Sequence, residues 1–300
     1  MNPRGTRGFV GFAYAWFAVW FFAPAILILI YSLGKTAGLT QQGLVNLHHI
    51  GLGNFRTALS YPTGPVLTDS LQNAVLATAL CGAIAYPIAF FLATKLGPRA
   101  RMFGLLLVIV PFWTDYLLRM IGWQIFLAPI GLLYNGLHAV GIHTAYLSIL
   151  NTRGAVMIGL VYNYLPLFIL PLTVVIERID PILRQAADDL GGRAWTVFRT
   201  VTLPLSMPGV VAGTVLVFVP MLGDYVTPTL MGGAKGLMIG SLIASEFVEG
   251  QNWSLGAAMA ILLVLIIVGV VVAGWLLATG ARWLSQTLKR RSLAAAGALA

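Results

Sequence analysis

Six apolar stretches, separated by more polar ones, divide the sequence. A helix that crosses the hydrocarbon core of a bilayer needs about 20 predominantly apolar residues, with a lower limit of about 17. The pattern therefore predicts six membrane-spanning helices, at residues 9–33, 70–96, 102–127, 154–176, 209–225 and 256–279. The first stretch is longer than the apolar core of a secretory signal, which spans about 7–15 residues, so we expect it to be retained as a span.

The segments between the spans predict shorter elements. Residues 51–59 favour a short surface helix, residues 128–153 a short helix lying on the membrane face, and residues 237–247 a helix within a loop. Gly209 and Gly213 form a GxxxG pattern, which lets two membrane helices approach closely. We expect three regions, which are an N-terminal span with an outer segment at 1–68, a transmembrane domain at 69–280 and a basic cytoplasmic tail at 281–300.

A polar loop at residues 178–207 has a helical pattern of its own. Asp180 followed by Pro181 is a helix start signal, Gly191–Gly192 acts as a stop and hinge, and Leu203–Pro204 is expected to end the pattern. Apolar residues recur at helical spacing on both sides of the glycines, at Leu183, Ala186, Ala187 and Leu190 and then at Ala194, Val197, Phe198 and Val201. The loop therefore predicts two short amphipathic helices joined by a glycine elbow. A plain surface linker is the alternative, although a linker needs neither feature.

Composition places the chain in a membrane. Charged residues make up 9% of the 300 residues and hydrophobic residues 59%, whereas soluble domains average about 25% charged residues. The single cysteine, Cys81, excludes an internal disulfide and a multi-cysteine metal site. His48 and His49 are adjacent, so their side chains point apart on a helix or strand, and no third ligand is near them. We therefore expect no metal site.

The net charge of +9 would favour a nucleic-acid partner in a soluble protein, but the positions of Lys and Arg give a better explanation. With the N-terminus inside, 13 of the 18 Lys and Arg residues fall in cytoplasmic segments and 4 in outer segments. The positive-inside rule then places both termini and the 178–207 loop in the cytoplasm. We expect this chain to contact a lipid bilayer and no nucleic acid.

The sequence contains none of the common catalytic motifs that we sought. It has no GxxxxGK[ST] phosphate loop, no HExxH and no GxSxG. We therefore expect a chain that is not an enzyme and that does not hydrolyse ATP by a phosphate loop. If it transports a solute actively, the energy comes from a partner, and the 178–207 loop is the natural docking element.

Ionisable residues within the apolar stretches indicate a solute pathway or buried pairs, because a charge at the bilayer centre costs about 2.5–3.5 kcal/mol on insertion scales. Asp115 and Arg119 are four residues apart, so on a helix they can neutralise each other. A structural pair and a role in the pathway both stay open. Asp224 lies toward the outer end of the fifth span with no local cation. It is either an interfacial acid at a helix end or part of an anionic wall for a cationic solute.

Aromatic side chains near these acids favour a cationic solute, because aromatic faces attract cations. The candidates are Trp113, Trp123 and Tyr225, although Trp123 fits the aromatic belt at the membrane interface equally well. Glu246 and Glu249 are acids of the last outer loop. Both are candidates for the pore mouth or for a partner contact, and Glu249 fits a plain solvated position better.

The 178–207 loop resembles the EAA loop of the permease subunits of ABC importers, the type supplied by a binding protein. The family motif places A-A, L-G and L-P at the spacing found here, and its usual leading Glu is Gln185 in this chain. In that family the loop is a coupling helix that docks into a groove of the ATPase subunit. The resemblance implies that coupling to an ATPase is carried by Gln185, Ala186, Ala187, Asp188, Leu190, Gly191, Phe198, Leu203 and Pro204.

Other motifs resemble the spermidine/putrescine branch of these permeases, over residues 52–277. They are Pro111-Phe-Trp-Thr114, Gly223-Asp-Tyr-Val226, Leu230-Met-Gly-Gly-Ala-Lys235, Ile239-Gly240, and Trp253 with Gly256-Ala-Ala258. The resemblance implies an all-α polytopic membrane protein with six transmembrane helices and the fold of a type I ABC importer permease. Together with the intramembrane charges, it gives a hypothetical solute pathway through Trp113, Asp115, Arg119, Asp224, Tyr225 and Glu246.

The resemblance also implies partners and a mechanism. The chain would lie in the bacterial inner membrane with a second, different permease, two ATPase subunits and a periplasmic binding protein. It would hold no cofactor, because the ATPase subunits bind ATP-Mg. ATP would close the ATPase pair, the loop would transmit that closure, and the spans would alternate between inward-open and outward-open states.

Three alternatives stay open. In the first alternative, the chain is a permease of the same family that carries a small solute other than a polyamine. Outside this family, the chain is a stand-alone channel or secondary transporter, which needs ion-coupling acids near the midplane and internal repeats, or it is a membrane enzyme.

Overall fold

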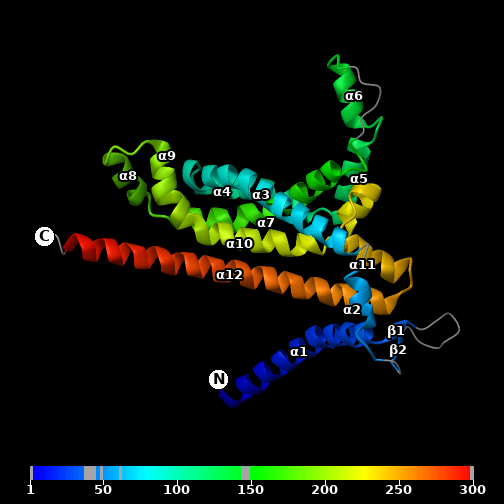
Figure 1. Cartoon of the computed structure of the whole chain (residues 1–300). Coiled ribbons are helices and arrows are strands. Elements are labelled where there is room, and N and C mark those ends of the chain that lie inside the picture. The colour runs from blue at the N-terminus through cyan, green and yellow to red at the C-terminus, as the bar shows by residue number, and fades with distance from the viewer. Residues whose placement is uncertain (1–2, 37–44, 48–49, 61–62, 143–148, 298–300) are drawn as a thin grey trace.

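The computed structural model describes residues 3–36, 45–47, 50–60, 63–142 and 149–297. Its described residues include six segments that are long and apolar enough to cross a membrane, so the prediction of an all-α protein with six spans is confirmed. Four of these segments lie within the long helices α1 (Pro3–Leu33), α3 (Thr63–Lys95), α7 (Arg153–Glu177) and α12 (Trp253–Gly297). A fifth, Ala194–Leu222, ends in helix α10 (Leu203–Leu222), and all of these helices are labelled in Figure 1.

The third span differs from the expected single helix at 102–127. The chain forms α4 (Pro98–Ile109), a 3-10 turn η1 (Val110–Trp113) and α5 (Tyr116–Leu127). Pro111 has no N–H to donate, and Thr114 has extended backbone with φ −71° and ψ 152°, so the helix stops before Asp115 starts the next one. The apolar segment that meets the length of a span is Tyr116–Ala139, which includes α6 (Leu132–Ala139). The short helix that the sequence predicted within residues 128–153 forms as α6, and its place relative to the bilayer stays a prediction.

Helix α7 packs between α3 and α10 and forms the centre of the core. Small residues allow this packing, since Ala74, Ala77, Ala85 and Ala89 of α3 are all buried. On α10, a Cβ at Gly209 would come within 2.9 Å of Val175, and one at Gly213 within 2.8 Å of Phe168. The GxxxG pattern thus brings α10 against α7, as the sequence predicted.

The polar loop after α7 forms two helices, as expected, but its end differs. The helices are α8 (Pro181–Asp189) and α9 (Ala194–Val197), and the chain then runs through a π-helical turn η2 (Phe198–Thr202) directly into α10. Leu203–Pro204 therefore does not end the helical pattern. A proline is tolerated in the first turn of a helix, where its missing N–H is not needed, and the π-helical turn before it has a wider hydrogen-bond ladder.

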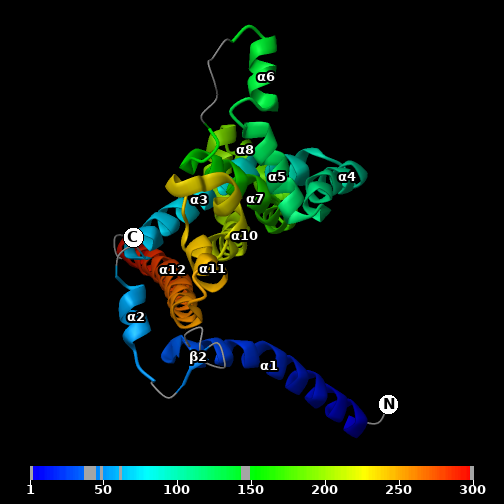
Figure 2. The ribbon, with the colours of Figure 1, turned by 90° about the vertical axis from the view of Figure 1, so that its right-hand side faces the viewer.

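The elements gather at two opposite ends of the bundle (Figure 1). The start of α1, the α3–α4 connection, helices α8 and α9 and the last turns of α12 lie at one end. The other end holds α6, α2 (Gly53–Ala58), α11 (Ile239–Val248) and a short antiparallel pair of strands, β1 (Lys35–Thr36) and β2 (Val45–Asn46). Figure 2 shows that α1 lies outside the α3–α7–α10 core, where it contacts α12.

Candidate functional site: an exposed elbow and a buried polar cluster

The elbow of the polar loop is built by local hydrogen bonds that the sequence signals predicted. Oδ1 of Asp180 accepts a hydrogen bond of 2.9 Å from the N–H of Ile182 and caps α8. At the other end, the N–H groups of Gly191 and Gly192 donate to the carbonyl oxygens of Asp188 and Ala187. Gly191 has φ +80°, a conformation that side chains with a Cβ rarely adopt. The elbow is therefore a fixed turn, and only glycine fits it without strain.

Four apolar side chains of this elbow are exposed. The exposed fractions are 64% for Ile182, 48% for Leu183, 90% for Leu190 and 69% for Trp195. They lie at one tip of the molecule, on α8, α9 and the turn between them (Figure 1). Exposed apolar clusters rimmed by polar residues mark sites where another protein binds. The elbow therefore carries exposed apolar side chains at the end of the bundle that also holds the α3–α4 connection.

The far side of the elbow is anchored on α3. The ring of Phe198 lies edge-on to Tyr86 of α3 with 5.3 Å between centroids, and it stacks on Trp195 at the same distance. The hydroxyl groups of Tyr86 and Ser206 are 2.7 Å apart and hydrogen-bonded. Of the residues predicted for coupling, Phe198 thus connects the exposed elbow to the core, whereas Gln185, Ala186, Asp188 and Leu190 are exposed.

A buried acid lies after α10, on the side of the bundle away from the elbow. Asp224 is 6% exposed. Its Oδ1 accepts hydrogen bonds from the N–H groups of Val226 at 3.0 Å and Thr227 at 3.2 Å, and its Oδ2 accepts from the hydroxyls of Thr227 at 2.7 Å and Tyr116 at 2.5 Å. Asp224 thus lies directly after the end of α10, and in this conformation both of its carboxylate oxygens are held by protein donors. Its place in a solute pathway stays a prediction. Tyr116 and Thr227 were missed as its partners, although an Asp two and three residues before N–H donors is a known turn signal.

The expected pair of Asp115 and Arg119 does not form. Oδ1 of Asp115 accepts hydrogen bonds from the N–H groups of Leu117 at 2.8 Å and Leu118 at 3.1 Å, so it caps α5. The guanidinium carbon of Arg119 lies 5.3 Å from the ring centroid of Phe112 and 5.7 Å from that of Tyr116. A carboxylate at the N-cap position faces the first amides of the helix and is turned away from the side chain four residues on. The positive charge of Arg119 is instead stabilised by two aromatic faces.

Tyr116 joins these charged residues into one cluster. Its ring lies under Arg119, and its hydroxyl donates to Asp224. Asn163 of α7 reaches the same region, where its Nδ2 lies 3.3 Å from the sulfur of Met120. Nε of Arg119 and Oδ1 of Asn163 are buried without a hydrogen-bond partner among the described residues. Unsatisfied buried polar atoms are rare, and they often occur at functional places.

The other predicted pathway residues do not contact the carboxylate of Asp224 by any described hydrogen bond. Trp113 is 75% exposed and Tyr225 is 55% exposed. Glu246 is half-buried on α11. For metals, His48 and His49 lie outside the described residues, and the part of the chain that is described has no group of three His, Cys, Asp or Glu side chains that could hold an ion.

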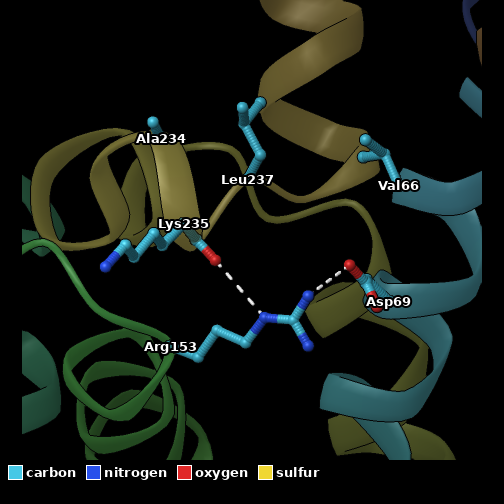
Figure 3. A pocket seen from close by; sticks show the side chains of 6 residues that line it. All are labelled: Val66, Asp69, Arg153, Ala234, Lys235 and Leu237. Carbon is cyan, nitrogen blue, oxygen red and sulfur yellow. Dashed lines mark hydrogen bonds and ion pairs between the residues drawn. The ribbon is translucent and has the colours of Figure 1, made fainter. Parts of the chain in front are cut away.

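A pocket of about 380 Å³ lies beside the first turns of α3 and α7 (Figure 3). These helix ends are opposite the elbow (Figure 1). Arg153 crosses the pocket, and its Nη2 forms a 2.5 Å ion pair with Asp69 while its Nε donates to the carbonyl oxygen of Lys235 at 3.4 Å. The lining residues are Val66, Asp69, Arg153, Ala234, Lys235 and Leu237. The ion pair of Arg153 and Asp69 thus joins the start of α7 to the start of α3 at this pocket.

The sequence of this chain is similar to a known family and to curated relatives. Residues 85–286 match the family described as "Binding-protein-dependent transport system inner membrane component". The spermidine/putrescine transport system permease protein PotB of Haemophilus influenzae is 39% identical over 263 residues, which cover 87% of this chain and 90% of that protein. PotB of Escherichia coli K12 is 38% identical over 252 residues, which cover 84% of this chain and 90% of that protein.

A solved structure shows the same fold. A chain of a bacterial alginate ABC transporter, solved in complex with an alginate pentasaccharide-bound periplasmic protein, superposes with a TM-score of 0.69 at 16% identity, and covers 89% of this chain and 91% of that chain. This chain thus has the expected fold of a type I ABC importer permease. Since the family match and the PotB relatives both extend over most of its length, the chain belongs to the inner-membrane permease components of binding-protein-dependent transport systems.

Proposed function

We propose that this chain is the permease subunit of an ATP-driven importer of polyamines such as putrescine and spermidine. The observation that carries the coupling part of this proposal is the uncovered apolar surface of the elbow, where Leu190 is 90% exposed, in a chain without a phosphate loop. The substrate class is supported by the names of the PotB relatives at 38–39% identity.

The partners follow from the docking surface and the family. A dimer of ATPase subunits binds ATP-Mg and receives the elbow, a second and different permease completes the pathway, and a periplasmic binding protein delivers the solute. The chain is a multi-pass protein of the inner membrane. The distribution of Lys and Arg favours cytoplasmic N- and C-termini, with the elbow on the same side.

Coupling requires a turn that keeps its conformation while the ATPase subunits move. The fixed geometry of Gly191 and the contact of Phe198 with Tyr86 support a rigid transfer of movement from the ATPase to the spans. The docking residues are those of the coupling motif, namely Gln185, Ala186, Ala187, Asp188, Leu190, Gly191, Phe198, Leu203 and Pro204. ATP binding changes the state of the spans only to the extent that it favours one state over the other.

The solute pathway uses the intramembrane charges. Asp224 supplies the negative charge that binds a cationic amine. In the conformation seen here, four hydrogen bonds from protein donors satisfy its carboxylate. Movement of Tyr116 on α5 removes one of the two donors to Oδ2 and opens a position there for the solute. Along the same route we place Trp113, Asp115, Arg119, Tyr225 and Glu246, which line the way from the outer mouth.

The test is uptake of labelled putrescine and spermidine into proteoliposomes that hold the co-purified complex and its binding protein. We expect uptake with ATP inside and none without it. If the binding protein stimulates ATP hydrolysis but no polyamine is taken up, the assignment as an importer permease stands and the assignment of polyamines as the substrate is wrong. Uptake driven by a proton gradient without ATP, or the absence of any co-purified ATPase, would contradict the ABC assignment of the function.

A further inference from the structure

Arg101, near the start of α4, holds the end of α3 by three hydrogen bonds. Its Nε donates to the carbonyl oxygen of Leu92 at 3.1 Å, and its Nη2 donates to those of Ala93 at 3.0 Å and Leu96 at 3.2 Å. The last carbonyl groups of a helix have no partner within the helix, and a cation there also complements the helix dipole. The side chain of Arg101 is only 18% exposed. This arginine is therefore fixed to the end of α3.

The remaining nitrogen of the same guanidinium reaches the element that precedes the elbow. Nη1 of Arg101 forms an ion pair with Glu177, the last residue of α7. Glu177 is three residues before Asp180, which caps α8. The chain between the ion pair and the docking helix is thus too short to absorb much movement, because three residues span at most about 11 Å.

The segment that follows the elbow is also tied to α3. Tyr86 of α3 is hydrogen-bonded to Ser206 of α10 and packs against Phe198 of the π-helical turn. The polar loop therefore enters through Glu177 and leaves through Phe198 and Ser206, and both ends are fastened to one helix. Close packing adds to this connection, since a Cβ at Gly104 of α4 would lie 2.5 Å from the Leu92 side chain of α3.

We propose that Arg101 and Tyr86 are positioning residues for coupling, which make α3 and α4 move with the elbow when the ATPase subunits close. The proposal rests on the proposed function, because it needs an ATPase that docks on the elbow. Neither residue touches the ATPase or the solute. Their role is to deliver the displacement of α8 to α3, whose far end carries Asp69 and Ser70 beside the outer pocket.

The experiment uses the reconstituted complex of permease, ATPase and binding protein, and measures putrescine uptake and ATP hydrolysis in the same vesicles. Glu177→Gln and Arg101→Gln each remove the ion pair, and Tyr86→Phe removes the hydroxyl that meets Ser206. We expect each variant to retain the ATPase on purification and to hydrolyse ATP, while uptake per ATP falls about three- to tenfold, a size typical of coupling residues outside the binding sites.

The double variant Arg101→Gln/Glu177→Gln tests whether the pair acts as one unit. If it does, the double variant loses no more uptake per ATP than Arg101→Gln alone, which also removes the three hydrogen bonds to the end of α3. The matched control is Arg99→Gln, which removes an exposed arginine two residues away for which no ion pair occurs in the described part of the chain. We expect its uptake per ATP to be unchanged.

Two outcomes overturn the proposal. In the first, Glu177→Gln and Tyr86→Phe leave both uptake and ATP hydrolysis unchanged. In the second, uptake and ATP hydrolysis fall in parallel, so that uptake per ATP stays constant. The second outcome would mean a merely structural role. Failure of the proposed function looks different, because then the unaltered chain itself would show no ATPase on purification or no ATP-dependent uptake.

Discussion

At the scale of single residues, the buried carboxylate of Asp224 carries the solute contact that we propose. A charge in a membrane protein persists where donors stabilise it, and Asp224 has four of them from three residues. Two come from backbone N–H groups and two from hydroxyls. Because a hydroxyl can accept as well as donate, the site tolerates an amide in place of the carboxylate.

We therefore predict that Asp224→Asn folds and joins the complex but transports polyamines poorly. The amide oxygen can accept from Val226 and Thr227, and its nitrogen can donate to the two hydroxyls, so the main loss is the negative charge. A charge-assisted hydrogen bond contributes roughly 1.5–3 kcal/mol, so we expect the concentration of diamine for half-maximal uptake to rise by about tenfold or more. Initial rates of putrescine uptake over a range of concentrations measure this.

Glu249→Gln is the control, because it removes an exposed acid on the same side of the bundle. Its uptake kinetics should match those of the unaltered chain. If Asp224→Asn also shows unaltered kinetics, Asp224 is not part of the solute pathway.

The sequence predicted which residues carry charge within the membrane, but it did not predict their partners. Asp115 illustrates the reason, since the i, i+4 spacing to Arg119 matters only if one helix includes both residues. The chain is extended at Thr114, so Asp115 caps a helix instead of lying within it. The contact of Tyr116 with Asp224 joins residues 108 positions apart, and no local pattern encodes such a pair.

At the scale of elements, the elbow was predictable because all its signals are local. Asp180, Pro181 and Gly191 each act within one turn of the helix that they start or stop. The continuation through Leu203–Pro204 was not predictable in the same way. A proline is normally read as a helix stop, and here a π-helical turn precedes it and the helix runs on.

We predict that Gly191→Pro abolishes ATP-driven uptake while leaving membrane insertion intact. Proline fixes φ near −65°, whereas the elbow needs +80° at this position, so the two helices of the loop must change their relative direction. The same loss is expected when a bulky residue replaces Ala187, whose carbonyl oxygen accepts from Gly192. Uptake in vesicles and the amount of membrane-embedded protein are the two measurements.

The comparison variant is Gly97→Ala, because Gly97 has φ −67° and a Cβ there would meet no atom within 4 Å. It should transport normally. Normal transport by Gly191→Pro or by the Ala187 variant would remove the elbow from the coupling mechanism.

At the scale of the whole molecule, the two ends of the bundle carry different features. One end carries α8 and α9, and the other carries α6 and α11 (Figure 1). The contacts of Arg101 lie at the first end and the pocket beside Arg153 at the second. The six spans were predictable because apolar length is the strongest signal in a membrane sequence. Their neighbours were not, since the packing of α7 between α3 and α10 depends on small residues that many membrane helices share.

We predict that the elbow faces the cytoplasm and that the end of α6 faces the periplasm. The single cysteine, Cys81, is buried, so new cysteines can be labelled against a low background. Leu190→Cys and Val140→Cys place thiols at positions where the native side chains are 90% and 80% exposed. In intact spheroplasts, a membrane-impermeant maleimide should label Val140→Cys only, and in inside-out vesicles Leu190→Cys only. The reverse pattern would invert the topology.

The π-helical turn at Phe198–Thr202 has a consequence for insertions and deletions. Phe198 and Ser206 both meet Tyr86, although eight residues of regular α-helix would turn them about 80° apart. The π-helical turn contains one residue more than an α-helical turn. The directions of Phe198 and Ser206 about the helix axis therefore differ by only about 20°. A chain one residue shorter here would keep both contacts on a regular helix, whereas a chain one residue longer would rotate α10 away from α3. The length of this segment can therefore vary in one direction only.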